Sequence, residues 1–213
     1  MGEIHNQIIE KFNNKINPII LDIGSYDLSD SILFHDIFPS ANIHAFECDP
    51  RNIQVIKEND WHNKYKIILW EFAVGCKDGT IDFWPSEKIN FNSEWHLSGS
   101  IRKPYKHLEE YTVSFGQPIT IESKRLDTWY KNSSIYNQMI EFIWIDGNGS
   151  EIDIIQGGEE CLKNVHLLWI ELFEKEMYLG QLCKQFVEKL LKTMGFEYAG
   201  LSHGHNYLYE RKI

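Results

Sequence analysis

Carboxylate side chains stand at the ends of several short apolar segments of this sequence. Asp22 lies near the end of the first segment, just before Gly24, and Glu47 follows the second. Glu71 follows the third segment, and Asp146 follows a later one. If these segments are parallel strands, their carboxyl ends share one edge of a sheet, where ligands bind beside the first strand. We therefore predict that these side chains converge on one ligand site.

The turn after the first expected strand, residues 22–28, distinguishes between two cofactors that both carry a ribose, NAD and S-adenosylmethionine. Glu47 lies about 20 residues beyond Gly24, where an acid accepts hydrogen bonds from the ribose of NAD or S-adenosylmethionine. A dinucleotide site needs G-x-G-x-x-G so that the backbone can approach a pyrophosphate, but residues 22–28 contain a single glycine. Asp22 and Asp27 would repel phosphate, whereas they suit the ammonium and sulfonium groups of S-adenosylmethionine. We therefore predict S-adenosylmethionine, the alternative being that Asp22 and Gly24 only form a turn or a helix cap.

Apolar segments typical of buried strands alternate with helix-like segments along the chain. The expected strands are 19–23, 42–46, 66–69, 80–84, 119–121, 140–145 and 166–172, with a closing hairpin of 196–200 and 207–210. The expected helices are 28–38, 50–61, a short one around Trp129 with Asp127 or Ser123 as its cap, 151–162 and 182–194. This alternation predicts an α/β fold with a mostly parallel sheet, covered by helices on both faces. We expect one antiparallel strand, 207–210, at or near an edge.

The chain contains no repeat, low-complexity tract or Pro/Gly-rich linker that would divide its 213 residues. We therefore expect a single domain over 1–213, with residues 1–17 as an N-terminal helical arm. Residues 85–118 are long, mixed and aromatic, without clear periodicity. Segments of that length in a compact domain are usually functional or mobile, so we expect a lid or a substrate-binding segment.

The composition argues against several classes of protein. The formal net charge is -10, and an acidic chain is repelled by phosphate backbones, so we expect no nucleic acid partner. The four cysteines show no zinc-binding spacing, so we expect no metal site and reduced thiols, as in a cytoplasmic protein. No apolar run of the sequence is long enough to span a bilayer.

Several segments match a known pattern, in order and with fitting spacing. They are Leu21–Ser25, Ala45–Asn52, Ala73–Gly79, Ile119–Ile121 before Arg125–Asp127, Ile145–Glu151 before Gly157–Glu159, and Trp169–Glu171. Ala45–Asn52 and Ile145–Glu151 are the most specific of these segments. Together they resemble the FkbM family of S-adenosylmethionine-dependent methyltransferases, and the resemblance runs from about Ile19 to about Leu172.

The resemblance implies a fold, a reaction and a set of site residues. The fold is the Rossmann-like class I methyltransferase fold, whose seven-stranded, mostly parallel sheet has one antiparallel strand. The reaction is O-methylation, typically of a hydroxyl on a sugar, glycolipid or polyketide-like product, so we expect a small-molecule or glycan acceptor. By the same resemblance, Asp22, Gly24 and Ser25 form the loop on the methionine side, and Glu47 holds the ribose. The other expected cofactor-binding residues are Tyr26, Cys48, Glu71, Phe72, Ala73 and Asp146, with Glu71–Ala73 bordering the adenine.

Three positions depart from the pattern of that family. Leu28 stands where the family usually has a second glycine, Trp144 where it has a lysine, and Asn148 where it has an acid. These departures motivate an alternative hypothesis, in which the chain is a catalytically impaired relative that binds a ligand or acts as a scaffold. A third hypothesis is an RNA methyltransferase, which the acidic net charge disfavours.

Methyl transfer to a hydroxyl is an in-line displacement, for which a protein supplies alignment and a base within hydrogen-bond reach of the acceptor. Asp146 is the candidate base by position, and its alternative role is to bind the cofactor or to cap the following helix. Glu171 ends a later strand and is a second candidate, the alternative being an ordinary carboxylate at the rim.

Candidate acceptor-binding residues lie in loops around this edge of the sheet. Ser98 and Ser100 belong to the long segment, Asn148 follows Asp146, and His203 lies in the loop of the closing hairpin. Each of these side chains can hydrogen-bond to a hydroxyl, or can serve only as a turn or solvated loop residue. Three aromatic side chains in the long segment or directly before it can stack on a sugar face or form a small satellite core. They are Trp84, Phe91 and Trp95.

Overall fold

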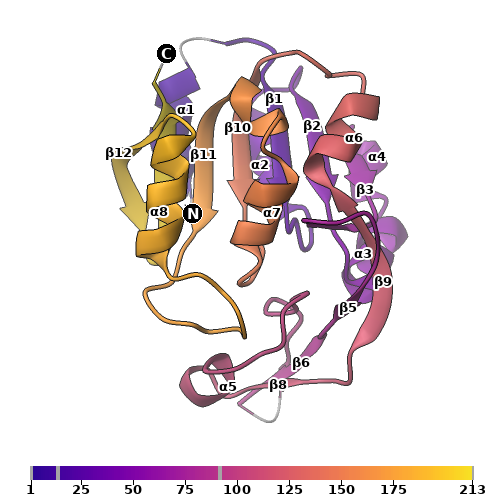
Figure 1. Cartoon of the computed structure of the whole chain (residues 1–213). Helices are drawn as coiled ribbons and strands as arrows, with labels where there is room; N and C mark the ends of the chain where they lie inside the picture. The colour runs from indigo at the N-terminus through magenta and orange to yellow at the C-terminus, as the bar shows by residue number, and fades with distance from the viewer. Residues whose placement is uncertain (1, 13–14, 91–92, 213) are drawn as a thin grey trace.

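A seven-stranded sheet stands at the centre of the computed structural model, which describes residues 2–12, 15–90 and 93–212 (Figure 1). Its strands are β1 (Ile19–Ile23), β2 (Asn42–Phe46), β3 (Ile68–Trp70), β10 (Ile140–Ile145), β11 (Val165–Glu171), β12 (Phe196–His203) and β13 (Asn206–Arg211). They stand in the order β12-β13-β11-β10-β1-β2-β3, and β13 runs antiparallel to its neighbours while the other pairs are parallel. This confirms the predicted mostly parallel sheet, with its antiparallel strand next to the edge.

Helices cover both faces of this sheet, as the alternating sequence pattern predicted. One layer contains α1 (Gly2–Ile9), the 3₁₀ turn η1 (Glu10–Phe12), α2 (Ser29–Ile37), α3 (Pro50–Glu58) and α4 (Trp61–Lys64). The other contains α6 (Leu126–Asn132), α7 (Glu151–Gly157), the 3₁₀ turn η2 (Cys161–Asn164) and α8 (Lys184–Thr193), and it faces the viewer in Figure 1. Within the described ranges, no helix combines the length and the apolar character needed to cross a membrane.

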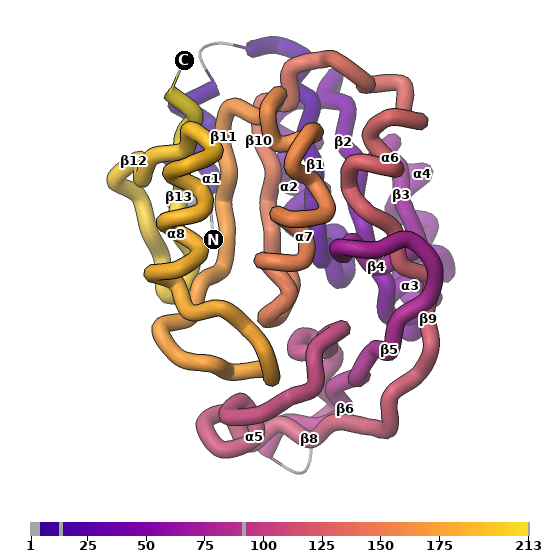
Figure 2. Tube along the Cα trace, in the orientation of Figure 1, coloured from indigo at the N-terminus to yellow at the C-terminus, as the bar shows by residue number. Residues whose placement is uncertain are grey.

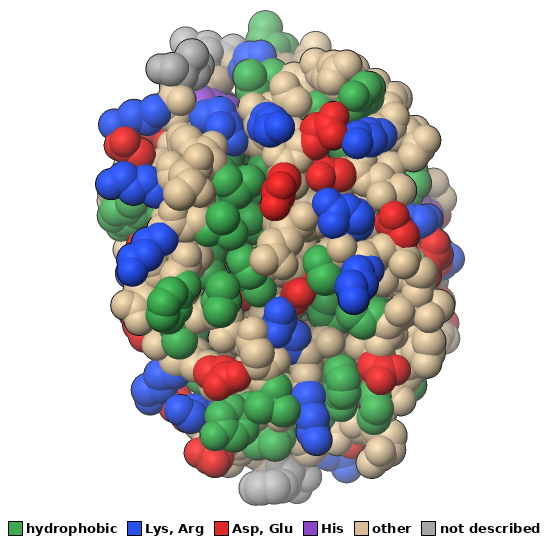
Figure 3. All heavy atoms as spheres, viewed as in Figure 1, with side chains coloured by type: hydrophobic (Ala, Val, Ile, Leu, Met, Phe, Trp, Pro, Cys, Tyr) green, Lys and Arg blue, Asp and Glu red, His purple; other side chains and the backbone are tan. Residues whose placement is uncertain are grey.

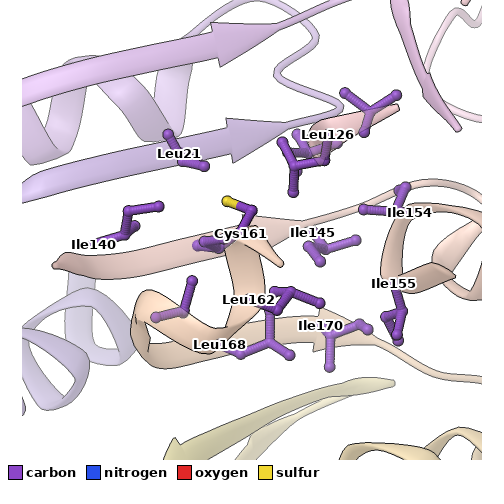
Figure 4. Packing of buried hydrophobic residues seen from close by; sticks show 14 of the residues in the cluster. Leu21, Leu126, Ile140, Ile145, Ile154, Ile155, Cys161, Leu162, Leu168 and Ile170 are labelled. Atoms are coloured by element: carbon purple, nitrogen blue, oxygen red, sulfur yellow. The ribbon is translucent and has the colours of Figure 1, made fainter. Parts of the chain in front are cut away.

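All residues of β1 are buried, because helices pack on both sides of the strand. Ile20 belongs to the apolar cluster beneath α1 and α2, whereas Leu21 and Ile23 belong to the cluster beneath α7 and α8. Figure 4 shows the second cluster, where Ile154 of α7 and Leu162 of η2 come together with side chains of the strands. Burying one such side chain contributes about 1.5–3 kcal/mol, so the sheet is a rigid support for the loops at its carboxyl edge.

The helix predicted over 151–162 begins at the expected residue, but its predicted end is wrong, because α7 ends at Gly157 and η2 follows at Cys161. The break falls at Gly157 and Gly158, and glycine has a low helix propensity. A Cβ atom on Gly157 would lie 2.0 Å from the carbonyl oxygen of Gly75. The close approach of β4 (Ala73–Gly75) therefore requires glycine at the end of α7.

The predicted cap of the helix around Trp129 is also wrong. Neither Asp127 nor Ser123 caps α6. The Oδ1 atom of Asp127 instead accepts hydrogen bonds from the backbone N–H groups of Glu160 and Cys161 at 3.0 and 2.9 Å. These N–H groups at the start of η2 thereby gain a hydrogen-bond partner. The Ser123 hydroxyl donates to a backbone carbonyl 3.0 Å away in the turn before β5. The partners of both side chains come from segments distant in the sequence.

Residues 85–118 form a lobe with its own small sheet, which consists of β7 (Ser93–Glu94), β6 (Ser86–Ile89) and β8 (Val113–Phe115). The lobe also contains α5 (His107–Glu110), and it follows a second three-stranded sheet of β4, β9 (Ile119–Arg125) and β5 (Gly79–Phe83). Strands this short leave little periodicity in the sequence. In Figure 2 the lobe lies beyond the carboxyl ends of β10 and β11, beside the loop that joins β11 to α8.

The lobe is attached to that loop, residues 172–183, by main-chain and side-chain contacts. Pro104 forms a β-bridge with Tyr178, and the N–H groups of Tyr105 and His107 both donate to the carbonyl of Met177. An ion pair joins Lys175 to a glutamate of α5 at 2.8 Å. Two segments far apart in the sequence therefore enclose the carboxyl edge of the sheet together.

Candidate cofactor and methyl-transfer site

A pocket lies at the carboxyl ends of β1, β2 and β10, where the lobe meets the central sheet. Its volume is about 90 Å³. The expected site residues that line it are Gly24, Tyr26, Glu47, Cys48, Phe72, Ala73, Ser100, Asp146 and Asn148. The structure thus gathers residues from distant parts of the sequence at one edge, as expected for strand ends in a parallel sheet.

Glu47 follows β2, and three backbone N–H groups hold its carboxylate. Its Oε2 accepts from Tyr26 at 2.8 Å, and its Oε1 accepts from Cys48 at 2.8 Å and from Asp49 at 2.7 Å. Burial raises the pKa of Glu47 to about 7, although the three donors favour the charged form. Because Glu47 also lines the pocket, its remaining lone pairs are available to the hydroxyls of a ribose.

The turn after β1 has a strained backbone that follows the shape of the pocket. Gly24 has a φ of 87°, and a Cβ atom there would lie 1.9 Å from the carbonyl oxygen of Asp146, so glycine is required. Tyr26 and Leu28 have φ values of 48° and 65°. Such conformations cost roughly 1–3 kcal/mol each and cluster at ligand-binding loops. The conformation at Tyr26 accompanies its N–H bond to Glu47.

Asp22 lies beneath this turn and is absent from the lining of the pocket. Its Oδ2 accepts the hydroxyl of Ser31 in α2 at 2.6 Å. Burial, followed by the charge of Asp30, raises the pKa of Asp22 to about 8. Ser25 is buried beside the pocket, and its Oγ has no hydrogen-bond partner within the described part of the chain. A buried hydroxyl without a partner is available to a ligand.

Three carboxylates lie at or just after the ends of β10 and β11, and of these only Asp146 lines the pocket. Burial raises the pKa of Asp146 to about 6, and the charge of Asp30 adds to this increase. Glu151 begins α7, its Oε1 accepts the N–H of Gly149 at 3.0 Å, and burial raises its pKa to about 7. Burial raises the pKa of Glu171 well above its ordinary value, and the charges of Asp146 and Glu151 add to it. Crowded carboxylates of this kind favour a bound cation or a held proton.

The apolar side of the pocket comes from the residues after β3. Phe72 and Ala73 line it together with Phe46, which suits the flat face of a purine. Glu71 lies outside the pocket, where its carboxylate is 43% exposed and 2.6 Å from the ammonium group of Lys57. The structure therefore brings two of the three residues expected to border the adenine to the pocket.

The lobe closes the pocket with residues that the sequence did not single out. Those lining it, besides Ser100, are His96, Leu97, Gly99 and Ile101. The Nδ2 of Asn148 donates to the carbonyl of Leu97 at 3.1 Å, and the hydroxyl of Tyr178 donates to the carbonyl of Ser98 at 3.0 Å. Because these contacts link segments far apart in the chain, no local sequence signal marks them.

The four expected acceptor-binding residues fall into two groups. Ser100 and Asn148 line the pocket. Ser98 is buried behind it, and its Oγ accepts the indole N–H of Trp95 at 2.9 Å. His203 is exposed and pairs with a residue of β13 at the far edge of the sheet, away from the pocket. The structure brings Ser100 and Asn148 together and leaves His203 apart.

Two of the three aromatic residues considered for sugar stacking make contacts within the lobe or directly before it. Trp84 forms a β-bridge with Ser100, and Trp95 makes the bond to Ser98 described above. Neither tryptophan lines the pocket. Phe91, the third aromatic residue considered for sugar stacking, lies outside the described residues.

Two departures from the pattern of the resembled family lie on the side of the sheet covered by α1 and α2. Leu28 is fully buried and immediately precedes α2. The indole of Trp144 packs against the rings of His5, Phe34 and Trp169. Neither Leu28 nor Trp144 lines the pocket, so neither side chain obstructs it.

The charge of the pocket suits S-adenosylmethionine better than a cofactor that carries phosphate. In the described structure no Lys or Arg lines the pocket, whereas Glu47, Asp49 and Asp146 do. S-adenosylmethionine carries an ammonium and a sulfonium, which carboxylates attract, and a ribose that Glu47 can hold. The described residues also contain no group of three or more His, Cys, Asp or Glu side chains that could hold a metal ion.

Comparison with known proteins agrees with this geometry. Residues 22–198 match the model of the methyltransferase FkbM domain. The chain is 39% identical over 192 residues to the 2-O-methyltransferase NoeI of Sinorhizobium fredii (strain NBRC 101917 / NGR234), an alignment that covers 90% of this chain and 77% of that protein.

A solved structure shares the fold at much lower identity. The crystal structure of the methyltransferase FkbM from Methylobacillus flagellatus KT superposes with a TM-score of 0.51 and 14% sequence identity. The match covers 91% of this chain and 43% of that one, so the chain spans less than half of that protein. At this identity the likeness concerns the fold of the shared part.

Proposed function

Because this chain belongs to the FkbM methyltransferase family and uses S-adenosylmethionine as its methyl donor, we propose that it methylates a hydroxyl oxygen of a sugar-type acceptor. The observation that carries the proposal is the 39% identity to a protein named as a 2-O-methyltransferase, extending over 90% of this chain. The pocket supports it, since carboxylates and apolar side chains line it where a cationic nucleoside would bind.

Different residues of the pocket suit different parts of S-adenosylmethionine. Glu47 would accept hydrogen bonds from the ribose, and Phe72 with Ala73 would contact the adenine. The unpartnered hydroxyl of Ser25 and the turn at Gly24 would hold the methionine part. When bound, S-adenosylmethionine supplies an electrophilic methyl group, whose transfer forms a carbon–oxygen bond, breaks the carbon–sulfur bond and leaves the electron pair on sulfur.

The protein must also remove the proton of the acceptor hydroxyl. We assign this to Asp146, which lines the pocket and whose pKa is raised to about 6, close to the range in which a base works best. Glu171 is the second candidate, because it ends the neighbouring strand and its pKa is raised by burial and by Asp146. Either carboxylate would take the proton only when it is ionised.

The lobe of residues 85–118 would act as a lid over the bound cofactor and acceptor. Residues 96, 97 and 99–101 of the lobe line the pocket, so a movement of this stretch would open it to a nucleoside and close it again. The bonds from Asn148 and Tyr178 to carbonyls of the lid would form again on closure. Ser100 and Asn148 are then the side chains placed to meet acceptor hydroxyls.

A sugar-type acceptor also agrees with the charge of the molecule. The formal net charge is -10, which opposes binding to a phosphate backbone. On the face shown in Figure 3, Lys and Arg side chains are interspersed with Asp and Glu. As part of the same proposal we place the protein in the cytoplasm, because all four cysteines are free thiols.

The test is a transfer assay with methyl-labelled S-adenosylmethionine and a panel of mono- and oligosaccharides. We expect label in a sugar product that survives alkali, because a methyl ether is stable where a methyl ester is hydrolysed. Label that alkali releases, or label found only on nitrogen or RNA, would overturn the proposal. A reaction without the protein, assayed in parallel, reports label that is incorporated without the enzyme.

A further inference from the structure

The turn between β10 and α7 is held in shape by its own side chains and by the start of α7. The hydroxyl of Ser150 donates to the carbonyl of Gly147 at 2.7 Å, and the N–H of Gly149 donates to Oε1 of Glu151 at 3.0 Å. Asn148 stands within this turn with a φ of 48°, a left-handed conformation that asparagine adopts more readily than most residues. Its side chain is therefore presented from a fixed backbone.

Asn148 connects this turn to the lobe of residues 85–118. Its Nδ2 donates to the carbonyl of Leu97 at 3.1 Å. Because a carbonyl oxygen only accepts hydrogen bonds, the contact requires an N–H group, which an ionised carboxylate in the same place would lack. The backbone N–H of Asn148 donates to the carboxylate of Asp146, so one residue contacts both the candidate base and the lobe.

Tyr178, from the loop between β11 and α8, holds the next residue of the lobe. It is fully buried, and its hydroxyl donates to the carbonyl of Ser98 at 3.0 Å. Its ring packs directly on the turn that carries Asn148, since a Cβ atom on Gly149 would lie 2.5 Å from the ring. Two adjacent carbonyls of the lobe are thus held by side chains from two segments that also contact each other.

The held carbonyls belong to a stretch of the lobe that forms one wall of the pocket. His96, Leu97, Gly99 and Ser100 line the pocket. The backbone N–H and carbonyl of Ser100 exchange hydrogen bonds with the backbone of Trp84, at 3.1 and 2.8 Å. These bonds join the wall to the strand before the lobe, whereas the two carbonyl bonds join it to the loops of the central sheet.

We propose that Asn148 and Tyr178 form a clasp, a pair of positioning residues that keeps this wall closed on a bound cofactor and slows its release. The clasp depends on an amide at position 148, since an ionised carboxylate there would repel the carbonyl oxygen of Leu97. The inference rests on the proposed function, which assigns the cofactor, and adds the residues that control how long the ligand stays bound.

The test combines two measurements on matched variants. Surface plasmon resonance gives the dissociation rate of S-adenosylhomocysteine, and hydrogen–deuterium exchange with mass spectrometry reports the opening of residues 95–101. Tyr178→Phe removes the hydroxyl and keeps the ring against Gly149. Because Tyr178 does not line the pocket, any change in ligand release acts through the lobe.

Asn148→Asp is the second variant, and it keeps the shape of the side chain while it removes the N–H donor. Aspartate also tolerates the left-handed conformation at this position. We expect each variant to speed the release of S-adenosylhomocysteine roughly two- to tenfold, the range for one lost hydrogen bond. Each should also speed deuterium exchange in residues 95–101 and leave exchange in β1 unchanged. Asn148→Gly, which permits the same φ and adds no charge, should act in the same direction.

Two controls remove similar hydrogen bonds away from the pocket. Tyr130→Phe removes the bond from a fully buried tyrosine hydroxyl to a backbone carbonyl 3.4 Å away. Asn132→Asp removes a bond of 2.7 Å from an amide to a backbone carbonyl and adds the same charge as Asn148→Asp. Neither residue lines the pocket, so neither control should change ligand release or the exchange of residues 95–101.

The outcomes separate the clasp from the function on which it rests. If the unaltered protein does not bind S-adenosylhomocysteine, the assignment of the cofactor fails, and unchanged deuterium exchange in the variants would overturn the clasp independently. Faster exchange of residues 95–101 with unchanged ligand release would overturn the control of release. If exchange also becomes faster in β1, the two side chains have a merely structural role and the proposal is overturned. If one variant does not fold, the other decides.

Discussion

Two carboxylates that line the pocket, Glu47 and Asp146, receive different numbers of backbone hydrogen bonds. On one side, Glu47 accepts three backbone N–H groups from residues close to it in the strand-end loops. On the other, one backbone N–H stabilises the charge of Asp146. Glu171 ends the neighbouring strand outside the pocket lining, and no described residue donates a hydrogen bond to its carboxylate. A group satisfied by backbone is preorganised for binding, whereas crowded and poorly satisfied carboxylates are suited to exchanging protons.

The largest effect that this comparison predicts is on turnover. Asp146→Asn should reduce kcat roughly 10²–10⁴-fold, because an amide cannot accept the proton of the acceptor hydroxyl. It should leave the affinity for S-adenosylhomocysteine within a few fold, if the carboxylate acts mainly in the chemical step. Methyl transfer at saturating cofactor and calorimetry on the same preparation measure both quantities.

Glu171→Gln is the matched control on the neighbouring strand. If Asp146→Asn abolishes cofactor binding and leaves saturated turnover intact, Asp146 is a cofactor ligand. Asp146 would then not be the base, and a large loss of kcat in Glu171→Gln would assign the base to Glu171. If neither quantity changes in Asp146→Asn, its carboxylate only supports the start of α7.

An effect of intermediate size is expected on cofactor affinity, at Glu47. Glu47→Ala should weaken S-adenosylhomocysteine by about 1–3 kcal/mol, or about 5- to 150-fold, because charged hydrogen bonds to the ribose are lost. The control is Glu71→Ala, since Glu71 is a nearby exposed carboxylate outside the pocket. Calorimetry of the two variants separates a specific contact from a general loss of negative charge. Equal losses in both variants would contradict the proposed role of Glu47.

The smallest effect concerns stability, through the buried Asp22. Its pKa is raised from 3.8 to about 8 in the folded protein, so folding favours its protonated form. The stability that this group contributes is therefore fully present below about pH 4 and is lost as the pH rises through about 8. Asp22→Asn keeps an acceptor for Ser31 and should be more stable than the unaltered protein at pH 8 by about 1–3 kcal/mol.

Thermal unfolding of the cofactor-free protein at pH 5.5 and pH 8 checks this prediction. A stability difference of about 1 kcal/mol shifts Tm by a few degrees, which such a measurement resolves. Asp82→Asn, at an exposed position of β5, is the control and should show no such difference between the two pH values. A variant Asp22→Asn that is less stable at pH 8 than the unaltered protein would mean that the buried carboxylate is stabilised by its surroundings.

Much of the fold could be predicted from local patterns. Runs such as 19–23 and 140–145 are apolar throughout because both faces of a parallel sheet are covered, and that pattern is visible without neighbours. The predicted end of the helix over 151–162 was wrong, because the helix stops at Gly157, where the carbonyl of Gly75 packs from another part of the chain. The small sheet within 85–118 escaped prediction because its strands have only two to four residues, which leaves little periodicity in the sequence.

The candidate site divides in the same way. Gly24, Glu47 and Asp146 could be placed at one edge from the sequence, since each follows or ends a strand whose direction the alternation indicates. The exposure of Glu71 and the distance of His203 from the pocket could not, because each depends on the exact end of its element. The resemblance to the FkbM pattern extended the prediction to Ser25 and Phe72, whose types alone carry little information.

The sequence by itself therefore determined which polar residues stand at the ends of the strands, the negative charge of the site and the class of cofactor. These follow from residue type and short-range spacing, which the chain retains in any fold. Only the tertiary structure decided that Asn148 holds the carbonyl of Leu97, that Trp144 faces away from the pocket, and that His5 reaches Asp30. Each of these contacts joins segments far apart in the sequence, and the energy that selects them arises only when the layers pack together.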